Sequence, residues 1–309
     1  MPRLFLIFLF LLLRHICLAE FPGPPPVSVW QGAQYIYPGI QHARLRVDNP
    51  RLMAINLVRV DLTNPYIRFV ATEADPMAGQ PMPDCPRFTV RTRRQTTGEF
   101  MKYCRRLPNE GGLGLPVLLA VNSCPWSPWE SPFTHKFSDN MGLLVSGGRL
   151  VCPSNGRPGL VVTWDNKLEF RDFPKDAQMT SDMYIVLCGF QMVMRNDEIV
   201  VKPSGKDLHP RTVWGLDKER KILYIMTIDG RQDGYSLGAD LYECAQMMKY
   251  AGASDAINMD GGGSTTLVYW SPVENQPVLL NQPNKSNYQR TVGASLGIYY
   301  APVRLQRRQ

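Results

Sequence analysis

The feature that most constrains the fold is a series of short apolar runs, interrupted by turn residues along almost the whole chain. Gly, Pro, Asn and Asp cluster between the runs, for example at Asp48-Asn49-Pro50 and Asp165-Asn166. Short runs with such boundaries predict β-strands. We expect strands at residues 34–37, 43–47, 53–61, 67–70, 116–121, 141–151, 159–164, 167–171, 184–190, 197–201, 212–216, 222–228, 256–259, 265–270 and 291–300.

Two capping boxes mark the segments in which helices are expected. Thr96 is followed by Glu99, and Asp240 by Glu243, so each first side chain and the later acid can satisfy one another's backbone N–H groups. The first helix should continue to about residue 106, and Gly252 is placed to end the second. Many strands with two to three helices predict a single α+β domain over residues 29–303, in which a mostly antiparallel or mixed sheet packs against the helices.

The N-terminal segment has the pattern of a secretory signal peptide. Arg3 precedes an apolar run at residues 4–13, and Cys17-Leu18-Ala19 places small residues at the two positions that matter for cleavage. The run is shorter than the roughly 20 residues of a membrane helix, although a retained, uncleaved anchor is the alternative. We therefore expect residues 1–19 to be removed and residues 20–28 to form a Pro-rich linker. No stable membrane span should remain, and the protein should be secreted or periplasmic.

Cysteine and charge content bear on the compartment and the partners. Removal of residues 1–19 would leave six of the seven cysteines, and an even number in an exported chain favours disulfide bonds. Cys124 and Cys152 flank a loop and a strand that should pack together, so we expect them to pair. Cys188 and Cys244 lie in apolar segments, where buried thiols are an equal alternative. The formal net charge of +7 suits an anionic ligand, while the arginine-rich residues 87–106 lack the aromatic interleaving that would favour nucleic acid.

The sharpest motif is Met-Asp-Gly-Gly-Gly-Ser-Thr at residues 259–265, which follows a short apolar strand. Three consecutive glycines are costly in a loop, because glycine loses the most conformational freedom on folding. Such a loop lets backbone N–H groups approach a ligand and form an anion-binding nest. A tight turn between two strands, the alternative, needs only one or two glycines. We interpret the motif as a binding loop that presents Asp260.

A second acid follows a second apolar strand. Asp229 is succeeded by Gly230 and Arg231, and this order repeats the arrangement at Asp260. A hairpin turn would explain Asp229 and Gly230 but not the arginine that comes next. Enzymes that cleave glycosides usually use two carboxyl groups, one as the acid and one as the nucleophile or base. We therefore expect Asp229 and Asp260 to form a pair on neighbouring strand ends.

Three further residues point to a phosphate group. His209 and Arg211 lie just before one predicted strand, and Arg290 lies just before the last one. Arginine binds phosphate through two parallel N–H donors, although each of these arginines alone would be an ordinary surface charge. Together with the glycine loop they predict a phosphate-binding site.

The order and spacing of four segments resemble the phosphodiester glycosidase family. They are Leu-His-Pro-Arg-Thr at 208–212, the strand and Asp-Gly-Arg run at 223–238, Ile-Asn-Met-Asp-Gly-Gly-Gly-Ser-Thr at 257–265, and Gln-Arg-Thr-Val-Gly-Ala at 289–294. The resemblance covers about residues 56–300 and implies that the glycine loop and the helix before it surround the active site. One departure concerns the family pattern Asn-Gly-Gly-Phe, which is Asn-Ser-Cys-Pro-Trp at residues 122–126 here.

The resemblance implies a hydrolase that cleaves the sugar–phosphate bond of a glycosyl-1-phosphodiester. Export would place this substrate, the one partner we expect, on a cell-surface or extracellular glycan. Asp260 is expected to act on the sugar, with Asp229 as its partner and His209 as a proton carrier. We expect no cofactor, although Asp260 or Asp229 could hold a divalent cation. Substrate binding is expected at Asn122, Arg211, Arg231, Gly261, Gly262, Gly263, Ser264, Thr265 and Arg290.

Two other functions compete with this one. The loss of both glycines after Asn122 favours a non-catalytic module that binds sugar phosphates. An ordinary glycosidase acting on neutral glycans needs neither a glycine-rich nest nor clustered arginines, so the sequence disfavours it.

Overall fold

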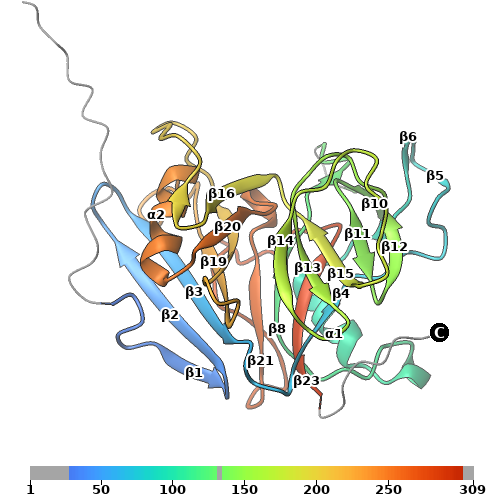
Figure 1. The fold of residues 1–309 in the computed structure, drawn as a ribbon, viewed down its shortest axis with the longest axis horizontal. Helices are drawn as coiled ribbons and strands as arrows, with labels where there is room; N and C mark the ends of the chain where they lie inside the picture. The colour runs from blue at the N-terminus through green and yellow to red at the C-terminus, as the bar shows by residue number, and fades with distance from the viewer. Residues whose placement is uncertain (1–27, 131–133, 302–309) are drawn as a thin grey trace, which may run out of the picture.

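An antiparallel sheet of eight strands forms one side of the molecule (Figure 1). The computed structural model describes residues 28–130 and 134–301, so the expected signal peptide and nearly all of the expected linker lie outside the described residues. In sheet order the strands are β1 (Gln34–Tyr37), β2 (Ile40–Val47), β3 (Met53–Asp61), β19 (Ile222–Ile228), β18 (Arg211–Leu216), β20 (Asp255–Asn258), β16 (Gln191–Arg195) and β17 (Glu198–Ile199). Segments from both ends of the chain thus build one sheet.

Two five-stranded antiparallel sheets form most of the remaining scaffold. The first contains, in order, β22 (Gln276–Leu279), β21 (Leu267–Ser271), β8 (Val117–Asn122), β23 (Ser295–Tyr300) and β4 (Ile67–Ala71). The second, at the right of Figure 1, contains β12 (Arg149–Cys152), β11 (Leu144–Ser146), β15 (Met183–Cys188), β13 (Gly159–Thr163) and β14 (Leu168–Arg171). Smaller sheets contain β7 (Thr92–Arg93), β10 (Phe137–Asn140) and β9 (Trp126–Ser127), and β5 (Pro81–Met82) with β6 (Cys85–Thr89).

The three large sheets contribute to one common apolar core. Successive side chains of a strand point to opposite faces, so Leu223 and Ile225 of β19 enter this core, whereas Tyr224 and Met226 pack on the opposite face. Trp214 of β18 is fully buried in the common core. Burial of this apolar area is the main driving force for folding, and it brings the ends of β18, β20 and β8 together.

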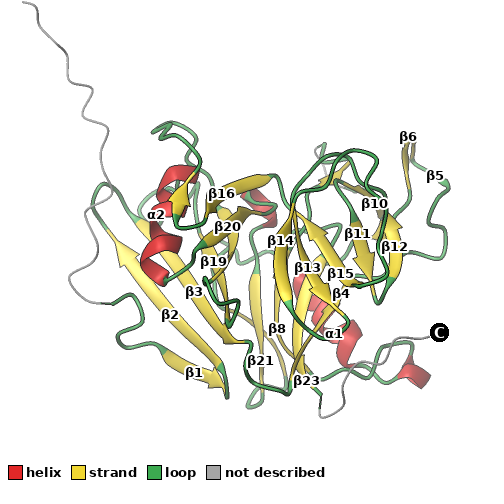
Figure 2. Ribbon diagram, in the orientation of Figure 1, coloured by secondary structure: helices red, strands yellow, loops and turns green. Residues whose placement is uncertain are grey.

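Two α-helices cover the outer faces of the sheets (Figure 2). The helix α1 (Thr97–Arg105) packs through Phe100 and Cys104 with residues of β8, and α2 (Leu241–Ala251) packs through Met248 on the eight-stranded sheet. Both expected capping boxes form, and Gly252 ends α2 with a φ of 106°. Two short 3₁₀ helices are η1 (Pro108–Glu110) and η2 (Gly262–Ser264). None of the described helices is long and apolar enough to span a membrane.

The predicted α+β class is wrong, because the structure is a β-rich fold. Of the described residues, 42% lie in strands and 10% in helices, and only two of these helices are α-helices. Every strand pair within the described ranges is antiparallel. Two Pro-containing segments in which no strand was expected, residues 71–89 and 123–140, contain the short strands β5, β6, β9 and β10. Proline is compatible with the start of a strand and with a sheet edge, so its presence did not exclude them.

All six described cysteines are free thiols. Cys188 and Cys244 are buried, which agrees with the buried-thiol alternative. The Cys152 Sγ donates to the carbonyl of Asn140 at 2.9 Å, and the expected bond between Cys124 and Cys152 is not formed in this structure. Burial raises the pKa of the Cys124 thiol to about 12, so the thiol is protonated and unreactive at neutral pH.

Candidate active site

Backbone hydrogen bonds hold the glycine loop against two neighbouring segments. The Asp260 N–H donates to the carbonyl of Ser123, just beyond β8, at 2.9 Å. The Gly262 N–H donates to the carbonyl of Pro210, just before β18, at 2.8 Å. Gly262 has a φ of 59°, a left-handed conformation that glycine adopts without strain. The position of the loop therefore depends on strands of two different sheets.

Asn122, which was expected to bind substrate, instead anchors both ends of the glycine loop. Its side chain is completely buried. Its Nδ2 donates to the carbonyl of Asp260 at 2.7 Å, and its Oδ1 accepts from the N–H of Thr266 at 3.0 Å and from the hydroxyl of Thr212 at 2.8 Å. Because these bonds are all internal, Asn122 positions Asp260 and does not face a ligand. Thr265, also expected to bind substrate, is buried as well.

A cavity of about 650 Å³ opens beside the loop, which is within the range of small-molecule sites. Most residues that were expected to act or bind lie on its wall. They come from segments that are far apart in the chain: the start of β18, the turn after β19, the glycine loop and the segment before β23. The predicted residues on the wall are His209, Arg211, Arg231, Asp260, Gly261, Gly262, Gly263, Ser264 and Arg290.

Asp260 has a strongly shifted ionisation equilibrium in this cavity. Burial of the carboxyl group raises its pKa from 3.8 to about 6. The side chain of Ser264, the positive charge of Arg290, the Gly261 N–H and Trp126 each favour the carboxylate, but they offset the desolvation only in part. A carboxyl group with a pKa near 6 is ionised at pH 7 and yet basic enough to accept a proton during a reaction.

His209 is held in one tautomer by an arginine. The Arg231 Nη2 lies 3.1 Å from the His209 Nδ1, and a guanidinium can only donate, so Nδ1 accepts and Nε2 carries the proton. Desolvation and the charges of Arg211 and Arg231 lower the pKa of His209. A neutral imidazole at pH 7 therefore offers an N–H donor, rather than a positive charge, to a ligand. Arg231 itself has a φ of 59°, a conformation that a non-glycine residue adopts only at a cost.

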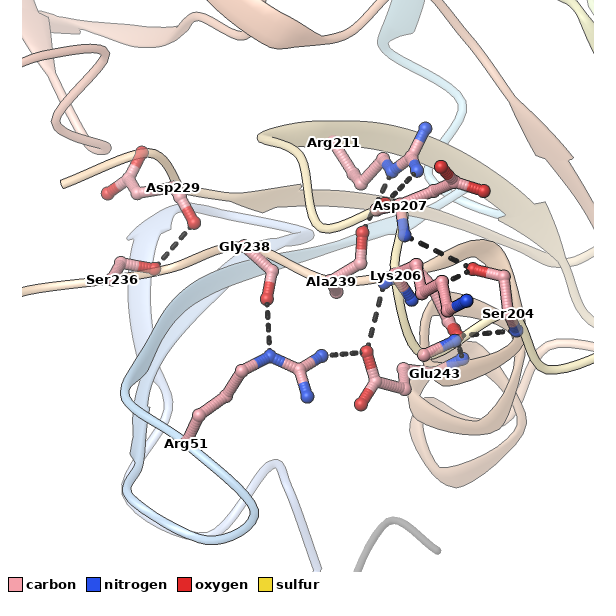
Figure 3. Close-up of polar contacts among 12 residues, drawn as sticks. Arg51, Ser204, Lys206, Asp207, Arg211, Asp229, Ser236, Gly238, Ala239 and Glu243 are labelled. Atoms are coloured by element: carbon pink, nitrogen blue, oxygen red, sulfur yellow. Dashed lines mark hydrogen bonds and ion pairs between the residues drawn. The ribbon is translucent and has the colours of Figure 1, made fainter. Parts of the chain in front are cut away.

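Arg211 is oriented by backbone carbonyl groups. Its Nε donates to the carbonyl of Ala239 at 3.0 Å and its Nη2 to the carbonyl of Asp207 at 2.7 Å (Figure 3). Asp240, the residue that caps α2, accepts from the N–H groups of Ser204 and Gly205 at 3.0 and 2.9 Å. The segment that carries His209 and Arg211 is thus tied to the N-terminus of α2.

The glycines of the loop are required for the close approach of Arg290. A Cβ atom on Gly263 would lie 2.4 Å from the Arg290 Nη2, and one on Gly261 would lie 2.8 Å from the carbonyl oxygen of Pro210. A Cβ on Gly262 would lie 3.4 Å from the Arg231 Nη1. A side chain at either of the first two positions would therefore displace its neighbour. Gly262 and Gly263 let two guanidinium groups lie directly against the loop, and Gly261 makes room for the carbonyl of Pro210.

The anion-binding nest expected from the glycines is only partly available. The N–H of Gly262 is bound to Pro210, and the N–H of Ser264 donates to the carbonyl of Gly261 at 3.1 Å. These amides cannot bind a phosphate without breaking internal hydrogen bonds. Positive charge at the cavity comes mainly from the side chains of the four arginines that line it, Arg157, Arg211, Arg231 and Arg290.

Comparison with known proteins places this site in a family. The sequence profile of the phosphodiester glycosidases matches residues 129–299, which is more than half of the chain. The chain belongs to the phosphodiester glycosidase family. No curated protein sequence matches it significantly.

Solved structures share the fold of this family member at low sequence identity. The catalytic domain of zebrafish N-acetylglucosamine-1-phosphodiester alpha-N-acetylglucosaminidase, auto-inhibited by its pro-peptide, has a TM-score of 0.59 and 18% identity, over 86% of this chain and 85% of that one. A hypothetical protein from Synechocystis has a TM-score of 0.53 and 13% identity, over 90% and 64%. A protein from Burkholderia pseudomallei K96243, provisionally described as exported, has a TM-score of 0.53 and 14% identity, over 80% and 74%.

Asp229 does not line the cavity that Asp260 lines. Its side chain is buried, and its carboxylate accepts from the Asn281 Nδ2 at 2.8 Å, the Gln282 N–H at 2.9 Å and the Tyr235 hydroxyl at 3.0 Å. In Figure 3 it lies well apart from Arg211. The structure of this family member therefore does not bring the two expected carboxylates to one cavity.

Sequence reasoning missed the other half of the cavity wall. Asn258 precedes Asp260 by two positions, and its buried Oδ1 has no hydrogen-bond partner among the described residues. Trp129 and Phe190 are 66% and 40% exposed, and the Arg157 guanidinium lies 5.1 Å from the Phe190 ring. The tryptophans at 126 and 129, shortly after β8, were the available signal in the sequence, but nothing in their spacing indicated which rings line the cavity with Asp260. The missed residues are Pro125, Trp126, Trp129, Met141, Arg157, Phe190, Gln191, Leu241, Asn258 and Met259.

Proposed function

We propose that the protein is a hydrolase that cleaves the bond between the anomeric carbon and the phosphate of a glycosyl-1-phosphodiester. The observation that carries this proposal is one cavity in which Asp260, with a pKa of about 6, lies beside Arg211, Arg231 and Arg290. The carboxylate suits the developing positive charge on a sugar, and the guanidinium groups suit a phosphate. Family membership supports the same chemistry.

In the proposed reaction the phosphate is both an anchor and a leaving group. Arg231 and Arg290 neutralise the charge that develops on it as the bond to the sugar breaks, and the His209 Nε2–H donates a further hydrogen bond. Asp260 takes a proton from the attacking water, whose oxygen forms the new bond to the anomeric carbon. The electron pair of the broken bond stays on the phosphate oxygen, so the products are a free sugar and a phosphate monoester. No second carboxylic acid is needed, because phosphate leaves without being protonated.

The natural substrate is proposed to be a cell-surface or extracellular glycan. Support comes from the N-terminal sequence, in which Arg3, the apolar residues 4–13 and Ala19 have the pattern of a signal peptide. Mass spectrometry of the protein from the medium or periplasm should show an N-terminus near Glu20. An N-terminus at Met1 in that fraction would contradict cleavage.

Hydrolysis in water enriched in ¹⁸O tests which bond breaks. We expect purified protein to release sugar and phosphate monoester from a glycosyl-1-phosphodiester, with the label in the sugar. Label in the phosphate would indicate attack at phosphorus, and would reject the glycosidase in favour of a phosphodiesterase. A neutral aryl glycoside of the same sugar is the control, and its preferred hydrolysis would favour an ordinary glycosidase.

A second candidate is a non-catalytic module that binds sugar phosphates. The placement of Asp229 away from the cavity favours it, because a catalytic pair of carboxylates is absent from the wall. Tight binding of a glycosyl-1-phosphodiester without release of sugar after prolonged incubation would support this candidate.

A further inference from the structure

A second cavity shares a wall with the one described above. It has a volume of about 320 Å³, and Arg231, Gly263 and Arg290 line both cavities. The guanidinium groups of Arg231 and Arg290 therefore lie between the two cavities. A phosphodiester has two organic groups on one phosphorus atom, and these leave it in different directions. Arginines that face two cavities at once fit such a group better than they fit a terminal phosphate.

The chemistry of the two walls differs. Asp260, Ser264 and His209 line only the larger cavity, together with the aromatic rings of Trp126 and Trp129. Because Asp260 must face the anomeric carbon if it is to act, the glycosyl group belongs in the larger cavity. The smaller cavity lies at the lower end of the roughly 300–1,000 Å³ typical of ligand sites.

The smaller cavity presents one tyrosine on a loop that is held rigidly. Tyr288 is 66% exposed. The Asn284 Nδ2 donates to the Tyr288 carbonyl at 2.6 Å, and the Asn284 Oδ1 accepts from the Tyr288 N–H at 3.0 Å. One amide side chain thus holds both backbone groups of an exposed aromatic residue. These bonds fix the backbone from which the ring projects, so ligand binding has to order the side chain of Tyr288 but not its loop.

A network from Asp229 supports the opposite wall of the same cavity. Gln232, which lines it, donates from Nε2 to the Gln282 carbonyl at 2.9 Å and accepts from the Gln282 Nε2 at 2.8 Å. The Gln282 N–H is in turn bound to the carboxylate of Asp229. Asp229 therefore acts on this cavity as a positioning residue.

We propose that the smaller cavity is the aglycone subsite, and that it receives a hydroxylated group of about one sugar ring from the alcohol side of the phosphodiester. The assignment of the glycosyl group to the larger cavity and of the aglycone to the smaller one rests on the proposed function. The phosphate lies on Arg231 and Arg290, the glycosyl group on the Asp260 side and the aglycone on the Tyr288 side.

Binding of two product-like phosphates tests this subsite without requiring turnover. Glucose 6-phosphate represents the aglycone product, and N-acetylglucosamine 1-phosphate represents the glycosyl side. Tyr288→Ala should weaken binding of glucose 6-phosphate about tenfold and change binding of the other ligand less than about twofold. Trp129→Ala should show the reverse pattern. Tyr35→Ala is the matched control, because Tyr35 is 69% exposed on the edge strand β1 and lines neither cavity.

The outcomes separate the subsite from the proposed reaction. Wild-type protein that does not bind glucose 6-phosphate, or binding that Tyr288→Ala leaves unchanged, overturns the subsite. If only Trp129→Ala abolishes binding of glucose 6-phosphate, the substrate lies in the opposite direction, and the subsite assignment is overturned. If Tyr288→Ala acts as expected but the protein hydrolyses no diester, the subsite stands and the proposed reaction fails. In an active enzyme, Tyr288→Ala should raise the KM for a hexose-6-yl diester more than that for a methyl diester of the same sugar.

Discussion

Asp229 and Asp260 follow two buried strands of the same sheet, yet their surroundings differ. Burial raises the pKa of both carboxyl groups. Asp229 accepts hydrogen bonds from Asn281, Gln282 and Tyr235, and its side chain is enclosed by them. Asp260 instead lies on the wall of a cavity that four arginines also line. A buried acid after a strand is therefore a poor guide to catalysis until its hydrogen-bond partners are known.

The different surroundings predict a structural role for Asp229 and a catalytic role for Asp260. A carboxylate whose oxygens already accept internal hydrogen bonds holds its neighbours in place and has no oxygen directed at a ligand. A desolvated carboxylate that faces a cavity has a raised pKa and space for a ligand, which is the usual condition of a catalytic base. The following substitutions test this division.

The largest effect should come from Asp260→Asn. The change keeps the size of the side chain and removes its charge, so turnover of a glycosyl phosphodiester should fall about 10³-fold or more. The melting temperature at pH 7 should be no lower than the wild-type value, because the loop is held by backbone bonds and the amide carries no buried charge. Asp233→Asn, which changes an exposed acid in the nearby turn, is the control. Near-wild-type turnover of the Asp260→Asn variant would remove the mechanism and favour the binding module.

Arg290→Ala should have the next largest effect, and on a different parameter. The loss of one charge-assisted contact to the phosphate should raise the KM for a phosphodiester by about 10–100-fold. Hydrolysis of a neutral aryl glycoside should change much less. Steady-state kinetics with both substrates check this, and equal losses on both would show that Arg290 acts mainly through Asp260.

Asp229→Asn should affect stability more than chemistry. The new amide would turn N–H donors toward donors already present, and an unsatisfied buried donor costs about 1–3 kcal/mol. Chemical denaturation should show this loss in the free energy of unfolding, while kcat of the folded fraction falls by less than about tenfold. A loss of turnover as large as that of Asp260→Asn, at unchanged stability, would restore the paired-carboxylate mechanism.

The pH dependence of both activity and stability should report the ionisation of Asp260. Because the base must be ionised, kcat/KM should fall about tenfold per pH unit below about 6. The folded-state pKa lies above the unfolded value of 3.8, so the contribution of this group to stability is fully present below about pH 4 and is lost as the pH rises through 6. Asp260→Asn should abolish that loss, and wild-type and variant stability curves of equal slope between pH 4 and 6 would contradict the shifted pKa.

Much of the local structure was predictable from the sequence. The strands β1, β3 and β19 have the expected bounds, and both helices begin after the expected capping boxes, at Thr96 and Asp240. These features depend on residues that are close in the chain. The class was wrong because short strands such as β7 exist only through pairing with a distant partner, here β10, which local patterns do not report.

The sequence by itself determined that a glycine loop presents Asp260 and that several arginines accompany it, since those residue types and their spacing have few other uses. Only the tertiary structure decided that Arg231 and Arg290 stand between two cavities, that Asn122 anchors the loop, and that Asp229 supports a wall instead of facing Asp260. The physical reason is that a side chain's partners depend on which distant strands pack together in the common core. The difference between a catalytic and a structural carboxylate lies in those partners.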